Sequence, residues 1–124
     1  MDGRLEVHHL AIRTQDVDAT AAFYKEVLGL VELRSERPGS VWLALAGNAV
    51  LMVERRLAGE PSIPAGSMEL VAFRVTDAGK TEIRDAARAR GCFDGETAHT
   101  VYFRDPDGRR VGVSTHPLIR QPDR

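Results

Sequence analysis

Cysteine is almost absent from this 124-residue chain, which contains Cys92 alone. A single cysteine cannot form a disulfide within one chain, and there is no signal-peptide pattern, so the reducing cytoplasm is the expected location. Long apolar runs are missing as well, since no stretch reaches the roughly 18–20 residues of a membrane-spanning helix. We therefore expect no membrane partner, and we assign Cys92 no chemistry.

Excess charge is the next feature that the chain lacks. Lys and Arg together number 17 and Asp and Glu 18, so nothing indicates a nucleic-acid partner. The sequence also has no nucleophile elbow, phosphate loop or dinucleotide-binding fingerprint. What it does have is 43% hydrophobic and 28% charged residues, which is typical of one globular domain with a buried core.

In the first half, the hydrophobic spacing predicts a strand, a helix and three short strands. Residues 5–14 alternate as a half-buried strand does, after which Asp16 or Asp18 can cap a helix that Gly29 ends. Extended runs follow at residues 31–35, 40–46 and 49–55, with turn formers at Pro38-Gly39 and Gly47-Asn48.

The second half repeats this order. Residues 58–67 have no hydrophobic periodicity, so we interpret them as a connection. After it we expect a strand over 68–75 and a helix that Asp77 caps and Gly91 ends. Three strands should follow, with a turn at 105–108. A shift of 61 positions places Ala11 on Ala72 and Arg13 on Arg74. We therefore predict one domain, 1–124, with modules at about 5–56 and 68–116, a linker at about 57–67 and a tail at 117–124.

Three segments carry a family resemblance. Residues 9–30, which include HLAIRT and FYKEVLGL, resemble the opening of a vicinal-oxygen-chelate module, residues 70–75 resemble its second opening strand, and residues 102–108 resemble its closing hairpin. The chain is thus similar to glyoxalases, bleomycin-resistance proteins and ring-cleaving dioxygenases. The resemblance implies an α+β fold in which two βαβββ modules form a curved mixed-sheet cup for a small ligand. It also implies a homodimer.

The metal ligands of that group are mostly missing. The resemblance places the four ligand positions at His9, Met52 (or Leu51, in a register shifted by one), Leu70 and Gly112, and only His9 has a suitable side chain. Because catalytic metal sites usually need three protein ligands, we expect no cofactor and a metal-independent small-molecule-binding protein.

A rebuilt site is the alternative. His9, Glu54 and His116 could hold a divalent metal ion and make the chain a lyase, isomerase or dioxygenase. A metal-free enzyme with His9 or Glu54 as general base is a further option, so whether the protein is an enzyme stays open.

The expected ligand surface is both cationic and apolar. Resemblance to glyoxalases implies that Arg13 contacts a ligand carboxylate, a task that suits a guanidinium fork, while a salt bridge to Glu54 or Glu69 is the alternative for Arg13 and Arg74. Core packing is the alternative for the apolar members. The full expected set is His9, Arg13, Trp42, Met52, Glu54, Leu70, Arg74, Tyr102 and Ser114.

Overall fold

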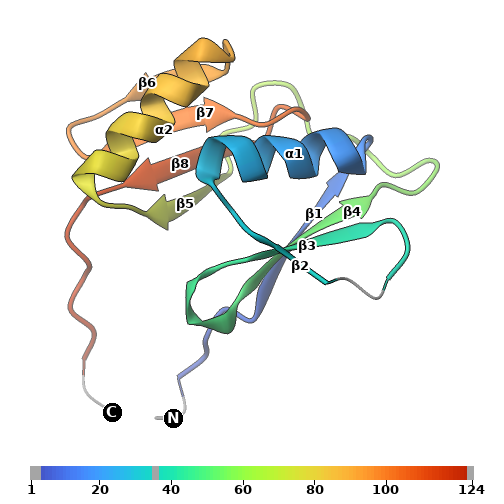
Figure 1. Cartoon of the computed structure of the whole chain (residues 1–124), viewed down its shortest axis with the longest axis horizontal. Coiled ribbons are helices and arrows are strands. Elements are labelled where there is room, and N and C mark those ends of the chain that lie inside the picture. The colour runs from blue at the N-terminus through green and yellow to red at the C-terminus, as the bar shows by residue number, and fades with distance from the viewer. Residues whose placement is uncertain (1–3, 35–36, 123–124) are drawn as a thin grey trace.

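Two βαβββ modules follow one another along the chain in the computed structural model, which describes residues 4–34 and 37–122 (Figure 1). The first module contains β1 (His9–Thr14), α1 (Val17–Leu28), β2 (Glu32–Leu33), β3 (Ser40–Ala44), the 3-10 turn η1 (Ala46–Asn48) and β4 (Val50–Arg55). The second contains β5 (Leu70–Arg74), α2 (Asp77–Ala89), β6 (Phe93–Glu96), β7 (Thr100–Arg104) and β8 (Arg110–Ser114). The predicted α+β fold class is confirmed.

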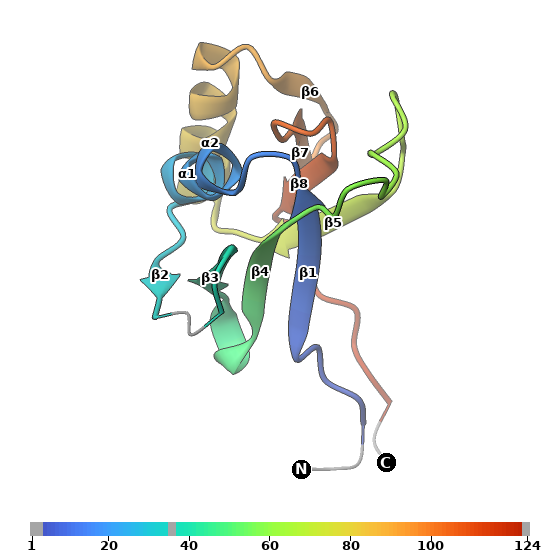
Figure 2. The same ribbon diagram turned by 90° about the vertical axis from the view of Figure 1, so that its right-hand side faces the viewer.

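Each module forms its own four-stranded mixed sheet. The strand orders are β1-β4-β3-β2 and β5-β8-β7-β6, so the two sheets have the same topology. In each sheet the first strand of the module runs parallel to the last, and the other pairings are antiparallel. Strands β1 and β5 therefore lie at sheet edges, and Figure 2 shows the two sheets as separate layers.

The helix ends follow local signals, with one exception. The Asp16 carboxylate accepts a hydrogen bond from the Ala19 N–H at 3.0 Å, and Gly29 ends α1 in the left-handed conformation. The predicted cap at Asp77 is wrong, because the Thr76 hydroxyl accepts from the Gly79 N–H at 3.1 Å. Asp77 is instead the first helical residue, where its charge favours the helix dipole. Neither helix in the described ranges has the length and apolar character to cross a bilayer.

Strand limits differ more from the sequence-based expectation. The first strand begins at His9 rather than at residue 5, and Leu5 in the preceding arm is 99% exposed. The run predicted over 31–35 shortens to β2 (Glu32–Leu33), and Ser35 lies outside the described residues. Alternation marks residues able to form a strand, but only a neighbouring strand with free hydrogen-bonding groups makes them one.

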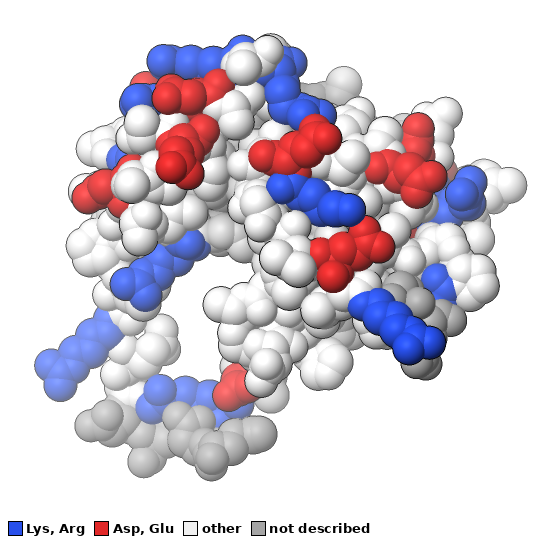
Figure 3. Space-filling model, in the orientation of Figure 1, with Lys and Arg blue, Asp and Glu red and all other residues white. Residues whose placement is uncertain are grey.

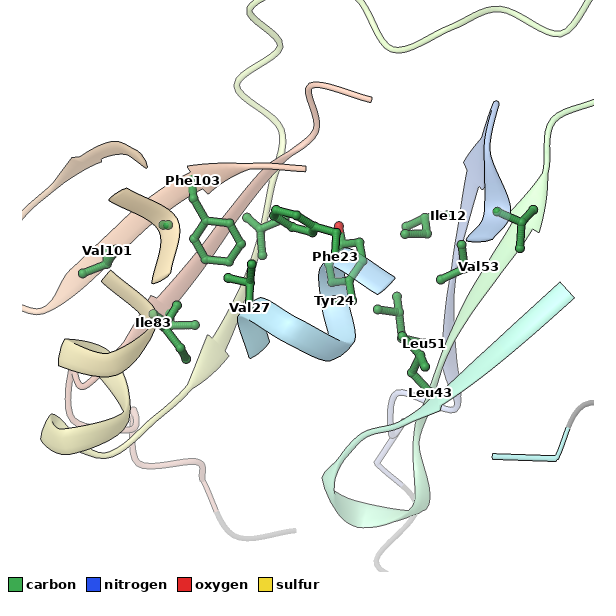
Figure 4. Packing of buried hydrophobic residues seen from close by; sticks show 14 residues of the cluster. Ile12, Phe23, Tyr24, Val27, Leu43, Leu51, Val53, Ile83, Val101 and Phe103 are labelled. Atoms are coloured by element: carbon green, nitrogen blue, oxygen red, sulfur yellow. The ribbon is translucent and has the colours of Figure 1, made fainter. Parts of the chain in front are cut away.

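One hydrophobic core serves both sheets. Helix α1 lies between the two sheets, and Phe23 packs edge-to-face on Tyr24 and at 6.0 Å, between ring centroids, from Phe103 of the second module (Figure 4). Val53 of β4 and Val113 of β8 are fully buried in the same cluster. Because the inner faces share this core, the outer face of each sheet points away from it.

A buried polar cluster also joins the modules. The Tyr24 hydroxyl donates to Asp105 Oδ2 at 2.7 Å, and the Asp105 carboxylate also accepts from the N–H groups of Asp107 and Arg109 and from the Arg109 guanidinium. Arg109 Nη2 then donates to the Arg13 carbonyl of β1 at 3.0 Å. Burial raises the pKa of Tyr24 well above its ordinary value, and the neighbouring Asp105 charge adds to the rise. The phenol therefore stays neutral as a donor.

Candidate functional site

The outer face of the first sheet brings together part of the predicted ligand surface. Ile12 and Thr14 are buried toward the core, so the alternate side chains of β1, His9 and Arg13, project from the opposite face. The strand register sets Arg13 beside Glu54. It also sets Met52 beside Trp42, which makes an apolar area next to the charged one.

The remaining predicted residues lie on the outer face of the second sheet. Arg74 is paired in register with Ser114. Tyr102 is covered by the Arg110 guanidinium, 3.9 Å from the ring centroid. Leu70 is 41% exposed at the start of β5. Within one chain, the predicted ligand residues are thus divided between two sheets that share no strand pairing.

Charged side chains gather at one end of the first face. Glu54 is largely buried there, with Oε2 at 2.9 Å from Arg37 Nη1 and Oε1 at 3.7 Å from Arg13 Nη1. The other edge of the Arg13 guanidinium binds Glu60, with Nη2 at 2.9 Å and Nε at 3.2 Å from Oε1. The Leu57 N–H donates to the same Oε1 at 3.0 Å. Glu69, the other carboxylate that the sequence suggested, has no ion pair with Arg13 in the described residues.

The Arg13 and Glu60 pair is held in its ionised form. The hydrogen bond from Arg13 lowers the pKa of Glu60 below its ordinary value of 4.5, and the Leu57 N–H lowers it further. The same hydrogen bond raises the pKa of Arg13. A carboxylate with a lowered pKa is a weaker proton acceptor, so Glu60 is suited to binding a cation rather than to general-base chemistry.

The four inherited metal positions do not fit a divalent ion. His9 is exposed, with its Nδ1 3.0 Å from Nδ1 of His8, and the positions at Met52, Leu70 and Gly112 carry no nitrogen or oxygen ligand. A Cβ atom at Gly112 would lie 3.4 Å from a Leu70 methyl carbon and 3.4 Å from a Thr100 methyl carbon. The Leu70 and Thr100 side chains therefore crowd the space that a carboxylate side chain at position 112 would have to occupy.

The alternative ligand set is not brought together either. Glu54 lies between two arginines, while His116 packs edge-to-face on His99, with ring centroids 5.0 Å apart, beyond the end of β8. Across residues 4–34 and 37–122, no group of three His, Cys, Asp or Glu side chains is placed to hold a metal ion.

An apolar cavity of about 600 Å³ opens between the modules. All of β5 borders it on one side, and Leu28 and Leu30 at the end of α1 border it on another. Figure 3 shows the molecule hollowed between the terminal arms and its main body, with acidic and basic side chains interspersed over the rest of this face. Sequence reasoning missed the cavity because its lining has the same composition as a core.

Comparison with known proteins supports the fold and the family. The family model described as "Glyoxalase/Bleomycin resistance protein/Dioxygenase superfamily" matches residues 6–113. No curated protein matches the chain.

Solved structures resemble the whole chain at low identity. Oxidase ChaP-H2 has a TM-score of 0.75 at 21% identity, over 92% of this chain and 95% of that one. The fosfomycin resistance protein FosX from Listeria monocytogenes has a TM-score of 0.76 at 18% identity, over 95% and 94%. A mutant of the Listeria protein, in complex with Mn(II) and 1S,2S-dihydroxypropylphosphonic acid, has a TM-score of 0.73 at 15% identity, over 91% and 94%. At such identities the likeness concerns the fold alone.

Proposed function

Because the chain belongs to the glyoxalase, bleomycin resistance protein and dioxygenase superfamily, we propose that it binds a small organic anion, without a metal ion, in a cup lined by the outer faces of its two sheets. The observation that carries this proposal is the composition of those faces. They combine the cations Arg13 and Arg74 with the apolar Trp42 and Met52, while His9 alone remains of the inherited ligand positions.

Arg74 is the strongest anion-binding candidate. It is exposed at the end of β5, and its guanidinium has no hydrogen bond or ion pair in the described part of the chain. A planar guanidinium binds carboxylates and phosphonates with two parallel hydrogen bonds. The FosX mutant that resembles this chain was solved with a phosphonic acid, which is an anion of the same class.

We further propose that two copies of the chain assemble the cup. Within one chain the two outer faces point apart, because the inner faces pack on a common core. Both β1 and β5 lie at sheet edges, and exposed edges are surfaces on which a second chain can add a strand. Pairing β1 of one copy with β5 of the other would join complementary halves of the ligand surface, and a two-fold dimer would make this contact twice.

The hydrogen-bonding groups of the two edges support this pairing. Val75 N–H donates to the Ser114 carbonyl of β8, so by alternation the backbone groups of Leu70 and Ala72 point outward. On β1, the His8 carbonyl accepts from β4, so the backbone groups of His9 and Ala11 point outward. The apolar cavity lies along β5 and leaves its edge accessible.

Metal analysis tests the metal-independent part of the proposal. Protein purified without chelators should contain only substoichiometric zinc, iron, nickel and manganese, and adding these ions should not raise its melting temperature, because residues 4–34 and 37–122 bring no three ligand side chains together. Elemental analysis and thermal shift measure both quantities. Stoichiometric metal that is lost in His9→Ala would overturn metal independence and favour the alternative of a metal-dependent lyase, isomerase or dioxygenase.

Ligand titration tests the cup itself. Trp42 is the only tryptophan and lies on the first outer face, so its fluorescence should respond to flat anions such as benzoate and phenylphosphonate. The neutral analogue benzamide should bind about tenfold more weakly, because it cannot form the charge-assisted pair. Arg74→Gln should remove part of that preference, because Arg13 is the second cation of the proposed cup. Equal binding of benzoate and benzamide would contradict an anion site.

A further inference from the structure

Glu60 occupies the edge of the Arg13 guanidinium that is shaped for a carboxylate. Nε and Nη2 of Arg13 both point at this carboxylate, at 2.9 to 3.2 Å, while Nη1 points toward Glu54. The Nε and Nη2 groups form the fork by which arginine binds a carboxylate or phosphonate side-on. We infer that Glu60 is an internal occupant of the anion position at Arg13, and that an external carboxylate must exchange with it. The inference rests on the proposed function.

The two carboxylates near Arg13 differ in how firmly they are held. Glu54 belongs to β4, its side chain is 10% exposed, and it has a second ion pair with Arg37 at 2.9 Å. Glu60 lies outside every helix and strand, and its side chain is 26% exposed. Besides Arg13, the Leu57 N–H is the one donor to this carboxylate among the described residues, and it lies within a short turn closed by the Glu60 N–H and the Leu57 carbonyl. Glu60 can therefore leave without breaking a strand pairing.

The charge balance indicates which ligands can replace it. Glu60 is the closest counter-charge of Arg13, Glu54 is shared between Arg13 and Arg37, and the positive charge of Arg56 also acts on Glu60. Exchange of Glu60 for one oxyanion of a ligand keeps the number of negative charges at Arg13 unchanged, whereas a neutral ligand would leave the Arg13 guanidinium without the carboxylate that Glu60 supplied. The ligand class is thus a small molecule with one carboxylate or similar oxyanion directed at Arg13. Its binding would release the turn at residues 57–60 of the connector.

Benzoate titration of Glu60→Gln tests the exchange. The variant should bind benzoate about three- to tenfold more tightly than the wild type, because the ligand no longer competes with a charged side chain. Trp42 fluorescence gives the affinity, and the NMR signal of the Arg13 Nε–H group shows whether benzoate lies at that guanidinium. Glu60→Ala, which has neither the carboxylate of the wild type nor the amide of Glu60→Gln, should give the same gain in benzoate affinity.

Glu69→Gln is the matched control. It removes the same charge from the neighbouring segment, and the Glu69 side chain makes no ion pair in the described residues, so its benzoate affinity should equal that of the wild type. Equal affinity in all variants, with benzoate at the Arg13 Nε–H group, would overturn the exchange and leave the proposed function standing. No Trp42 response in any variant would overturn the cup. The exchange is then decided by the NMR signal of the Arg13 Nε–H group alone. A benzoate-induced shift that is larger in Glu60→Gln than in the wild type would support the exchange, and a shift that is no larger, or no shift, would overturn it.

Discussion

Asp105→Ala is expected to lower the free energy of unfolding by about 3–5 kcal/mol, the range for removing one partner of a buried ion pair. The Asp105 side chain is fully buried, and it accepts from the Tyr24 hydroxyl, two backbone N–H groups and the Arg109 guanidinium. Its removal leaves the Arg109 side chain, which is 14% exposed, with no close carboxylate: the Arg13 carbonyl at 3.0 Å and a longer contact to Asp107 at 3.8 Å remain. Urea denaturation at neutral pH measures the loss.

Two further variants show whether Asp105 acts as the centre of this cluster. Tyr24→Phe removes one donor and should cost about 1–3 kcal/mol. Asp107→Ala, in the same turn, removes a carboxylate whose ion pair is long, and should cost less than either. If Asp105→Ala were no more destabilising than Asp107→Ala, the turn would have a local role only, and the link between the modules would depend on apolar packing.

The cluster around Asp105 connects stability to the arrangement of the site. Arg109 binds the backbone carbonyl of Arg13, while the Arg13 side chain binds Glu60. Together with the contact of Phe23 and Phe103, this fixes the two sheets with their inner faces toward one core. The same interactions that stabilise one chain thus turn its two outer sheet faces apart, so the cup proposed above requires a second copy.

Local features of the fold were readable from the sequence because their causes are local. Asp16 accepts from an N–H three residues away, and Gly29 takes a left-handed conformation that other residues adopt at a cost. The same reasoning was wrong at Asp77, because Thr76, which is also a capping residue, stands one position earlier and caps the helix. The length of β2 could not be predicted, since it depends on which residues of β3 are free to pair.

The sequence could predict only those parts of the candidate site that lie on strands, where the alternation of side chains assigns each residue to a face. Alternation places His9 and Arg13 on one face, and the register adds Glu54. Glu60 and Arg37 act from segments without a period, so no sequence pattern connects them to Arg13. The sequence also could not predict that the outer faces of the two sheets lie apart, because this depends on how the modules pack and not on the order of their strands.

The proposed pairing of β1 with β5 of a second copy predicts that Ala72→Pro converts a dimer into a monomer. Proline has no N–H, and the N–H of Ala72 points to the free edge of β5 by the alternation that Val75 sets. Losing one edge hydrogen bond in each of two equivalent contacts should cost about 2–6 kcal/mol of dimerisation free energy. Light scattering over a concentration series measures it.

The fold of the single chain should survive this substitution. Ala72 is exposed, its N–H is not used by β8, and Val71 before it is already extended, as the residue preceding a proline must be. Ala72→Gly keeps the N–H and is the matched control, expected to remain dimeric, while Ala11→Pro on the edge of β1 should dissociate the dimer as Ala72→Pro does. Both proline variants should lose benzoate binding at Trp42, because each monomer keeps its faces apart. Proline variants that stayed dimeric would overturn the pairing of β1 with β5, and a wild type that was monomeric yet bound benzoate fully would show that one chain forms the site alone.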